Sequence, residues 1–333
     1  MQTVAFLGCS HIHTPNFIKT IKARNDIKIK YIWDPNQNLA ERIAREVNSQ
    51  QITDLPGIWD DPSISGVIIC SQTNLHEQLV INAARAHKHI FVEKPLGFGK
   101  VDSAKMRDEI TKAGVIFQSG YFMRGRDTIL KVKQLINQGA FGKITRLRLS
   151  NCHSGGLDGW FVNKDWSWMT RLPEAGVGGF GDLGTHILDL ALYLLQSPVQ
   201  RVTASIKVVN GNFGNCDESG EGIMELQNGV TICLAAGWVD VANPVTLQLS
   251  GTEGHAMIYD GKLFMKSKNI EGADGTTPLS DLPPSLPHAF DMYLDSLIGK
   301  QGACLVTPEE AYRNSVIMEA FYIAAKNNVW ISL

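Results

Sequence analysis

The N-terminal stretch TVAFLGCSHIHTPNFIKTIKA, residues 3–23, decides the fold class. Its first part, TVAFLG (3–8), is a short apolar run that ends at a glycine, which predicts a buried strand. TPNFIKTIKA (14–23) then carries a threonine at the N-cap, a proline in the first turn and apolar residues at helical spacing, so it predicts a helix. A buried strand that runs directly into a helix is the repeating element of a parallel sheet.

The same strand–helix element recurs through residue 121. The apolar runs predict strands and the amphipathic runs predict helices, in the order strand 27–34, helix 38–47, strand 66–71, helix 76–87, strand 89–95, helix 101–114 and strand 115–121. Because the connections are short, this alternation predicts an α/β, doubly wound Rossmann sheet. We therefore expect residues 1–121 to form a dinucleotide-binding domain.

After residue 121 the pattern changes to long strand-like stretches with hairpin signals at Asn228-Gly229 and Asp260-Gly261. The expected strands lie within 199–209, 221–238 and 245–267, and the expected helices lie at 128–139, 288–299 and 307–326. Residues 276–287 form a proline-rich connector. Residues 122–333 are thus predicted to form a C-terminal α+β domain with a large, mostly antiparallel open sheet. We expect this domain to bind substrate and, through the exposed face of its sheet, to form a homodimer or homotetramer.

The amino-acid composition limits the classes of partner that we expect this chain to bind. The chain has 333 residues with 31 Lys+Arg and 33 Asp+Glu, so its formal net charge of −2 gives no electrostatic reason to expect nucleic acid or an anionic membrane. No apolar run approaches the roughly 18 residues of a membrane span. Six cysteines without a C-x-x-C pair, and a start without a signal-peptide pattern, predict a reducing, cytoplasmic location. A small, weakly charged substrate fits best.

The loop GCSHIHTP after the first strand keeps one glycine of the dinucleotide pattern G-x-G-x-x-G. Gly8 is present, whereas Ser10 and His13 stand at the other two glycine positions. A serine hydroxyl beside a helix N-terminus suits a phosphate, but an ordinary strand-to-helix turn explains the same residues. A rival interpretation takes His11 and His13 as the metal ligands of a barrel-type metal-dependent hydrolase, which would require eight βα repeats.

Three further strand ends carry polar residues. Asp34 is placed to accept hydrogen bonds from an adenosine ribose and to favour NAD over NADP, although a turn-forming aspartate before a proline looks the same. In SQTNLHEQ (71–78), Asn74 is either a helix N-cap or a contact of the nicotinamide ribose. In FVEKPLG (91–97), Lys94 ends a buried strand, where it suits donation to a substrate hydroxyl, and a solvated lysine is the alternative.

GGFGDLGTHILDL, residues 178–190, puts Asp182 and His186 on one helical face, with Asp189 following. A histidine titrates near neutrality, as a general base must, and a nearby aspartate can orient it. The glycines would let the backbone approach a ligand closely. The competing interpretation makes Asp182 the N-cap of the helix and His186 a buried core residue.

Taken together, VEKPLG and GVGGFGDLGTH resemble the glucose–fructose oxidoreductase / inositol dehydrogenase (Gfo/Idh/MocA) family, and the likeness extends over the whole chain through LINQGAFGKITRLR, SGTEG and TPEEAYRNSVIMEAFYIAAKNN. The resemblance implies an NAD(P)-dependent dehydrogenase that acts on the CH–OH group of a sugar, polyol or inositol. It implies that Lys94, Asp182 and His186 are catalytic, and that the peptide bond before Pro95 is cis. Some relatives of this kind hydrolyse glycosides through transient oxidation, which is the alternative on the same fold.

The resemblance also yields a set of candidate binding residues. For the cofactor, NAD with NADP not excluded, they are Gly8, Cys9, Ser10, His11, His13, Asp34, Ser71, Gln72, Asn74, His76, Glu93 and Lys94. For the substrate they are Tyr121, Arg124, Trp160, Trp166, Arg171 and His186. The tryptophans, with Trp168, belong to an unusually Trp-rich loop, where they either stack on a sugar ring or pack internally. No resident metal is expected.

Overall fold

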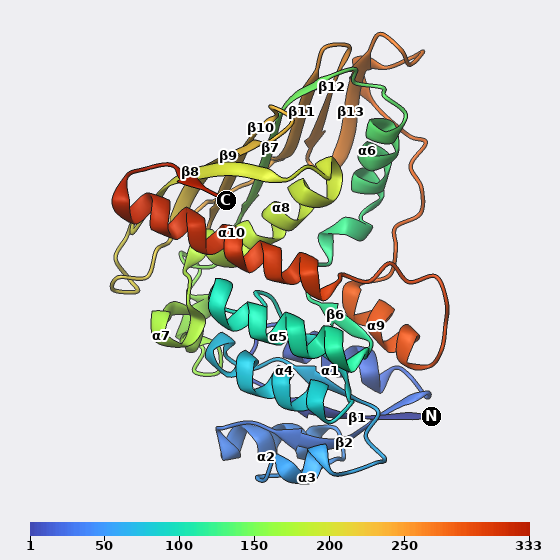
Figure 1. Ribbon diagram of the computed structural model, residues 1–333, viewed down its shortest axis with the longest axis vertical. Coiled ribbons are helices and arrows are strands. Elements are labelled where there is room, and N and C mark those ends of the chain that lie inside the picture. The colour runs from blue at the N-terminus through green and yellow to red at the C-terminus, as the bar shows by residue number, and fades with distance from the viewer. The chain divides into compact units, whose positions relative to one another are not determined.

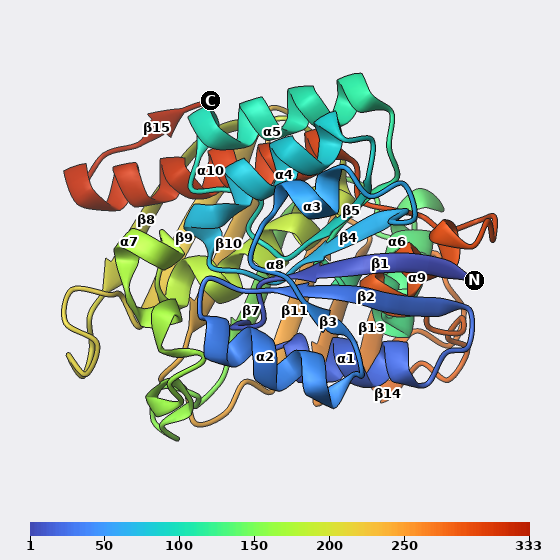
Figure 2. The same cartoon turned by 90° about the horizontal axis from the view of Figure 1, so that it is seen from below.

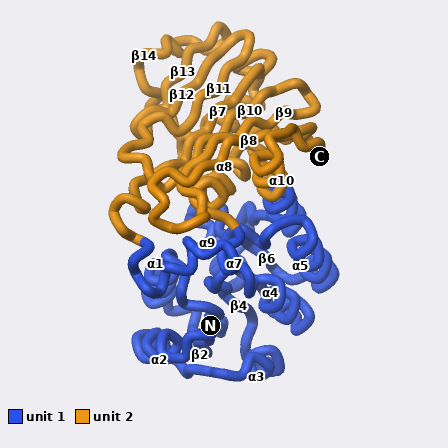
Figure 3. The backbone as a smooth tube through the Cα atoms, turned by 90° about the vertical axis from the view of Figure 1, so that its left-hand side faces the viewer, with its two compact units in different colours: residues 1–121, 161–176, 287–316 blue, residues 122–160, 177–286, 317–333 orange.

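The computed structural model describes residues 1–333, which form two compact units (Figure 3). Unit 1 comprises residues 1–121, 161–176 and 287–316, and unit 2 comprises residues 122–160, 177–286 and 317–333. The sequence pattern predicts a single division of the chain, after Tyr121. The chain in fact returns to unit 1 twice after that residue.

Unit 1 is built on a six-stranded parallel sheet in the order β3-β2-β1-β4-β5-β6. Its strands are β1 (Gln2–Leu7), β2 (Ile27–Trp33), β3 (Gln50–Gln51), β4 (Gly66–Ile69), β5 (His89–Val92) and β6 (Phe117–Ser119). This strand order is that of a doubly wound dinucleotide-binding sheet, and it confirms the predicted fold class. An open sheet is not an eight-stranded barrel, so the barrel-hydrolase interpretation of His11 and His13 is wrong.

Helices cover both faces of this sheet (Figures 1 and 2). They are α1 (Thr14–Lys22), α2 (Gln37–Glu46), α3 (Pro56–Trp59), α4 (His76–Arg85), α5 (Lys100–Ala113) and α9 (Ala289–Leu297), with the single turn η1 (Thr73–Leu75) before α4. The core on one face includes residues of α9 as well as of α1 and α2. Phe290 of α9 stacks on Phe17 of α1 with ring centroids 4.2 Å apart, and Tyr293 donates a hydrogen bond to the Val67 carbonyl. Residues far along the chain therefore complete the first core.

Unit 2 is built on a nine-stranded sheet in the order β14-β13-β12-β11-β7-β10-β9-β8-β15. Its strands are β7 (Ile144–Cys152), β8 (Val199–Lys207), β9 (Ser219–Leu226), β10 (Thr231–Gly237), β11 (Val245–Gly251), β12 (Gly254–Tyr259), β13 (Lys262–Ser267), β14 (Asp274–Pro278) and β15 (Ile331–Ser332). All neighbours are antiparallel except β7 and β10. The two hairpin signals are confirmed, since Gly229, Asp260 and Gly261 all have positive φ.

The long helix α8 (Gly179–Leu195) packs on one face of this sheet against β7, β9 and β10 (Figure 1). The remaining elements are α6 (Asp127–Asn137), the short α7 (Leu172–Ala175), α10 (Pro308–Asn327), and the turns η2 (Met123–Gly125), η3 (Trp160–Val162) and η4 (Ser167–Thr170). None of these helices is both long enough and apolar enough to span a bilayer. The α+β character predicted for the second half of the chain is confirmed.

Candidate active site

The first loop of unit 1 turns at Gly8, whose φ of +81° favours glycine. A Cβ at this position would lie 2.4 Å from the backbone of Ser71, which follows β4. The ends of β1 and β4 therefore meet closely at the point where the strand order reverses, and this is the place where doubly wound sheets bind their ligands. One glycine is retained because its turn admits no side chain.

Asp34, directly after β2, holds this loop. Its Oδ2 accepts a hydrogen bond from the Cys9 N–H at 2.6 Å, and its Oδ1 accepts one from the Asn36 N–H at 2.7 Å. Burial raises the pKa of Asp34, while the two N–H groups act in the opposite direction. The turn-forming interpretation and the cofactor interpretation are thus compatible, since the carboxylate bonds its own turn and also lies against the first loop.

Two side-chain oxygen atoms of the predicted cofactor set are buried without a hydrogen-bond partner in the chain. They are Ser10 Oγ and Gln72 Oε1. Buried polar atoms are nearly always hydrogen-bonded, so these two mark a place where a polar ligand would complete the bonding. Ser71 donates to the Gln72 carbonyl at 3.1 Å, and Asn74 is exposed within η1 and caps no helix. Together with Gly8 and Asp34, these residues fit a dinucleotide.

His11, His13 and Glu93 form a cluster whose ligating atoms lie within 4.8 Å of one another. The His13 ring donates from Nδ1–H to Glu93 Oε1 at 2.9 Å, and the His13 backbone N–H donates to His11 Nδ1 at 3.2 Å. Burial opposes the ionisation of Glu93, but the adjacent His11 and His13 hold its pKa well below the usual range. His13, which stands at one of the glycine positions, and His11 thus brace the first loop on Glu93, directly after β5.

Lys94 is buried, and the Lys94–Pro95 peptide bond is cis, as the resemblance implied. The Lys94 backbone N–H donates to Glu93 Oε2 at 3.1 Å. His76 is also buried, and its Nδ1 lies 3.1 Å from the Pro95 carbonyl and 3.2 Å from the Leu96 carbonyl. His76 therefore fixes the segment that follows Lys94.

The glycine run before Asp182 has a structural explanation in unit 2. Asp217 receives the start of α8, because its Oδ1 and Oδ2 accept the Gly178 and Phe180 N–H groups at 3.0 and 2.8 Å. A Cβ on Gly178 would lie 2.3 Å from the Asp217 carbonyl oxygen. The Tyr322 hydroxyl accepts a hydrogen bond from the Gly181 N–H at 3.0 Å and donates one to Asp217 Oδ1 at 2.9 Å. The glycines therefore allow close backbone packing, and the N-cap interpretation of Asp182 is wrong because Asp217 supplies the cap.

Asp182 and His186 lie one turn apart on α8. The buried indole of Trp238 donates from Nε1 to Asp182 Oδ2 at 2.9 Å, which fixes the carboxylate. The His186 ring is buried and packs edge-on against Phe122, with ring centroids 5.1 Å apart. Asp189, one turn further, forms a buried two-bond ion pair with Arg124 at 2.8 and 2.5 Å. Arg124, predicted to contact substrate, is engaged by this pair.

The aromatic substrate candidates are divided between the two units. Trp160 in unit 2 packs on His153, with ring centroids 4.7 Å apart. In unit 1, Trp166 is half-buried before η4, and Arg171 pairs with Glu174. Tyr121 is fully buried in the unit 1 core. The structure therefore gives Trp160, Arg171 and Tyr121 each a packing or pairing partner within its own unit.

Several residues of this region carried no sequence signal. Trp238, Asp217 and Tyr322 support α8 from positions far along the chain, and no spacing rule connects them to residue 182. Lys94 belongs to unit 1, whereas Asp182 and His186 belong to unit 2. Their joint action is therefore part of the proposal below.

Two models of one family match the chain. Residues 2–121 match "Oxidoreductase family, NAD-binding Rossmann fold", and residues 129–257 match "GFO/IDH/MocA C-terminal domain". Among characterised proteins, the chain is 27% identical over 287 residues to scyllo-inositol 2-dehydrogenase (NAD(+)) of Bacillus subtilis, covering 82% of this chain and 78% of that protein. It is 31% identical over 207 residues to myo-inositol 2-dehydrogenase of Thermotoga maritima, covering 62% and 58%.

It is also 33% identical over 167 residues to levoglucosan dehydrogenase of Pseudarthrobacter phenanthrenivorans, a match that spans 50% of this chain and 42% of the length of that enzyme. Among solved structures, levoglucosan dehydrogenase in complex with NADH and levoglucosan is similar with a TM-score of 0.82 and 22% identity over 99% of both chains. An NAD-binding oxidoreductase from Klebsiella pneumoniae is similar with a TM-score of 0.79 and 21% identity, over 99% of this chain and 98% of that one. The fold is thus shared along the full length, and with both family models matched in order the chain belongs to the Gfo/Idh/MocA family of oxidoreductases.

Proposed function

We propose that this protein is an NAD-dependent dehydrogenase that oxidises a secondary hydroxyl of a sugar or cyclic polyol. The observation that carries the proposal is the Asp182–His186 pair on α8, with Asp182 fixed by Trp238 and His186 buried one turn away. The relatives support it, because their names describe oxidation of inositols and of levoglucosan.

The residues around the first loop fit NAD. Gly8 brings two strand ends together, Asp34 offers its carboxylate to a ribose, and Ser10 Oγ is a buried hydroxyl that lacks a partner. Bound NAD supplies the two-electron acceptor of the oxidation. The chain itself supplies orientation of the ligand and the handling of the proton.

In the proposed mechanism Lys94 donates a hydrogen bond to the substrate oxygen and stabilises the negative charge that develops on it. His186 takes the hydroxyl proton as general base. Asp182, one turn earlier on α8, orients Lys94 and His186. His76 and Glu93 act as positioning residues, because they hold the backbone on either side of Lys94. General acid–base assistance of this kind is typically worth about 10²–10⁴ in rate.

The test is an absorbance assay for NADH with scyllo-inositol, myo-inositol and levoglucosan, each with NAD and with NADP. We expect His186→Ala to lower kcat on the active substrate by about 10²–10⁴ while NADH binding persists. His255→Ala, which changes an exposed histidine on β12, serves as the control. Unchanged turnover in His186→Ala, or no NADH with any polyol or sugar, would refute the proposal.

The same assays separate the alternatives. A glycoside hydrolase that uses transient oxidation would release product from a nitrophenyl glycoside with no net NADH. A metal-dependent enzyme at His11, His13 and Glu93 would lose activity after dialysis against EDTA. We expect EDTA to leave NADH binding and turnover unchanged, because His13 Nδ1–H already donates to Glu93 Oε1 and His11 Nδ1 already accepts the His13 backbone N–H.

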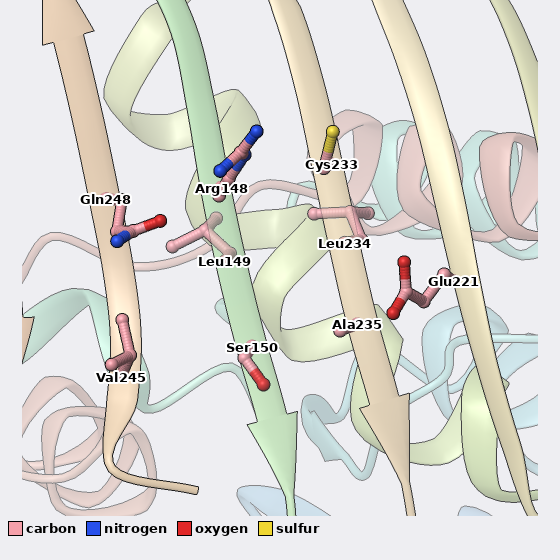
Figure 4. Close-up of a pocket in the computed structure, with 9 residues that line it drawn as sticks. All are labelled: Arg148, Leu149, Ser150, Glu221, Cys233, Leu234, Ala235, Val245 and Gln248. Carbon is pink, nitrogen blue, oxygen red and sulfur yellow. The ribbon is translucent and has the colours of Figure 1, made fainter.

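We also infer that the protein self-associates through the sheet face of unit 2 that α8 does not cover. This face holds a shallow pocket of about 430 Å³ (Figure 4), lined by Arg148, Leu149, Ser150, Glu221, Cys233, Leu234, Ala235, Val245 and Gln248. Ile223 is exposed beside it on β9. A half-apolar sheet face of this kind is more stable when covered. A monomeric mass at micromolar concentration in light scattering would refute self-association.

All six cysteines are free thiols in the structure, which agrees with the proposed cytoplasmic location.

A further inference from the structure

Residues 161–176, which we call the strap, belong to unit 1 although the chain on both sides of them belongs to unit 2 (Figure 3). Within unit 1 the buried Trp168 indole donates from Nε1 to the Ser10 carbonyl at 2.7 Å. At the end of the strap, a Cβ on Gly176 would lie 2.4 Å from the Phe98 ring, and Gly176 has a φ of +80°. The strap is therefore fixed against the Rossmann unit at both its centre and its end.

The strap also reaches α2. Asp165 forms an ion pair with Arg42, and the two side chains are 30% and 61% exposed. Beside this pair lies an open pocket of about 450 Å³. Its walls are Asn36, Asn38, Leu39 and Arg42 from α2 and the turn before it, and Asn163, Lys164 and Asp165 from the strap. The pocket is thus formed jointly by α2 and the strap.

This pocket adjoins Asp34. Asn36, one of its walls, donates its N–H to Asp34 Oδ1 at 2.7 Å. The negative charge of Asp165 is close enough to Asp34 to help raise the pKa of that carboxyl, after the larger effect of burial. A group attached to the ribose that Asp34 would bind therefore enters a pocket that contains a second carboxylate.

The residue types in the pocket indicate which chemical group it would accept or exclude. Arg42 and Lys164 are the side chains that would bind a ribose 2′-phosphate, which is a dianion. Asp165 forms an ion pair with Arg42 and adds a negative charge of its own, so the pocket with Asp165 present disfavours binding of the phosphate. An exposed ion pair contributes little free energy, so loss of Asp165 would release Arg42 at small cost to the fold.

We propose that this pocket is the site for the 2′ substituent of the adenosine ribose, and that Asp165 of the strap, together with Asp34, makes the protein select NAD over NADP. The proposal rests on the proposed NAD-dependent function. It assigns part of the cofactor specificity to a segment that lies more than a hundred residues after Asp34 along the chain.

The test measures binding of NADH and NADPH by energy transfer from tryptophan to the reduced nicotinamide, so no substrate is needed. We expect the wild type to prefer NADH. We expect Asp165→Asn to raise the affinity for NADPH relative to NADH at least about tenfold, the scale of one charge-assisted hydrogen bond. Combining it with Arg42→Ala is expected to abolish this gain. Asp158→Asn, which changes a carboxylate on the same loop that pairs with Ser154 in unit 2, is expected to leave the ratio unchanged.

A ratio that moves less than about threefold in Asp165→Asn, in a variant whose thermal midpoint matches the wild type, would overturn the inference alone. A gain that survives Arg42→Ala would overturn it as well, as would a wild type that prefers NADPH. A wild type that binds neither dinucleotide would overturn the proposed function and this inference together.

Discussion

Removing the carboxylate of Asp217 tests how the start of α8 is held. Asp217 is buried and accepts hydrogen bonds from the Gly178 N–H, the Phe180 N–H and the Tyr322 hydroxyl. In Asp217→Ala the Gly178 N–H keeps the Tyr322 oxygen at 3.2 Å, whereas the Phe180 N–H loses its acceptor. An orphaned buried N–H costs about 1–3 kcal/mol, and the lost Tyr322 bond about 0.5–1.5 kcal/mol. The lost charge at a helix N-terminus adds about 0.3–1 kcal/mol. We therefore expect the unfolding free energy to fall by about 2–5.5 kcal/mol.

The assay is urea unfolding followed by circular dichroism, with hydrogen exchange of the Phe180 amide as the local readout. Asp274→Ala is the matched control, because Asp274 also accepts two backbone N–H groups, from Thr276 and Thr277, but is exposed. We expect the unfolding free energy of the control to fall by less than about 1 kcal/mol, since water replaces the lost hydrogen bonds. An equal loss in the two variants, or unchanged exchange at Phe180, would refute the reasoning.

Three further predictions concern the same scaffold. Asp189→Ala leaves the Arg124 guanidinium buried without its carboxylate, so urea unfolding should show a loss of about 3–5 kcal/mol that Arg124→Met in the same chain largely recovers. In thermal unfolding, Gly178→Ala should lower the stability of the fold by about 1–3 kcal/mol, because the new Cβ would lie 2.3 Å from a backbone atom. Gly184→Ala should be neutral or raise the stability by up to about 1 kcal/mol, because the nearest neighbour of its Cβ is a side-chain atom at 3.4 Å. Burial lowers the pKa of His76, so on acidification the unfolded state binds the His76 proton before the folded state does. Unfolding free energies measured from pH 8 to 5 should therefore fall as the pH drops through about 6.5. A His76→Gln variant that loses as much stability over this range would contradict the prediction.

The sequence predicted the parts of the fold that local pattern controls. The strands and helices of the first 121 residues were found because each buried strand is a continuous apolar run and each helix has apolar residues at helical spacing. The hairpins at Asn228-Gly229 and Asp260-Gly261 were found because these pairs suit positive φ. The strand β3 and the helix α3 were missed because two and four residues are too few to show a period.

The site was predicted less completely, since long-range packing leaves no local trace. The identity of Gly8 and the positions of Asp34, Asp182 and His186 follow from motifs and from the family resemblance. The partner of Asp182, Trp238, lies 56 residues away, and the carboxylate that caps α8 lies 37 residues from Phe180. The Trp-rich loop suggested a sugar-stacking surface, whereas Trp168 is committed to the Ser10 carbonyl. Composition showed that the loop was unusual but not what it packs against.

The contribution of α9 to the first core constrains how this gene can be cut and recombined. Phe290 and Tyr293 fill space against Phe17 and Val67, yet they are encoded about 170 codons after the last strand of that sheet. A fragment ending near codon 121 would leave these apolar surfaces bare, and a chimera that swaps only the leading segment would mismatch them. Grafting the nucleotide module onto another protein therefore requires the distant coding segment to be transferred with it.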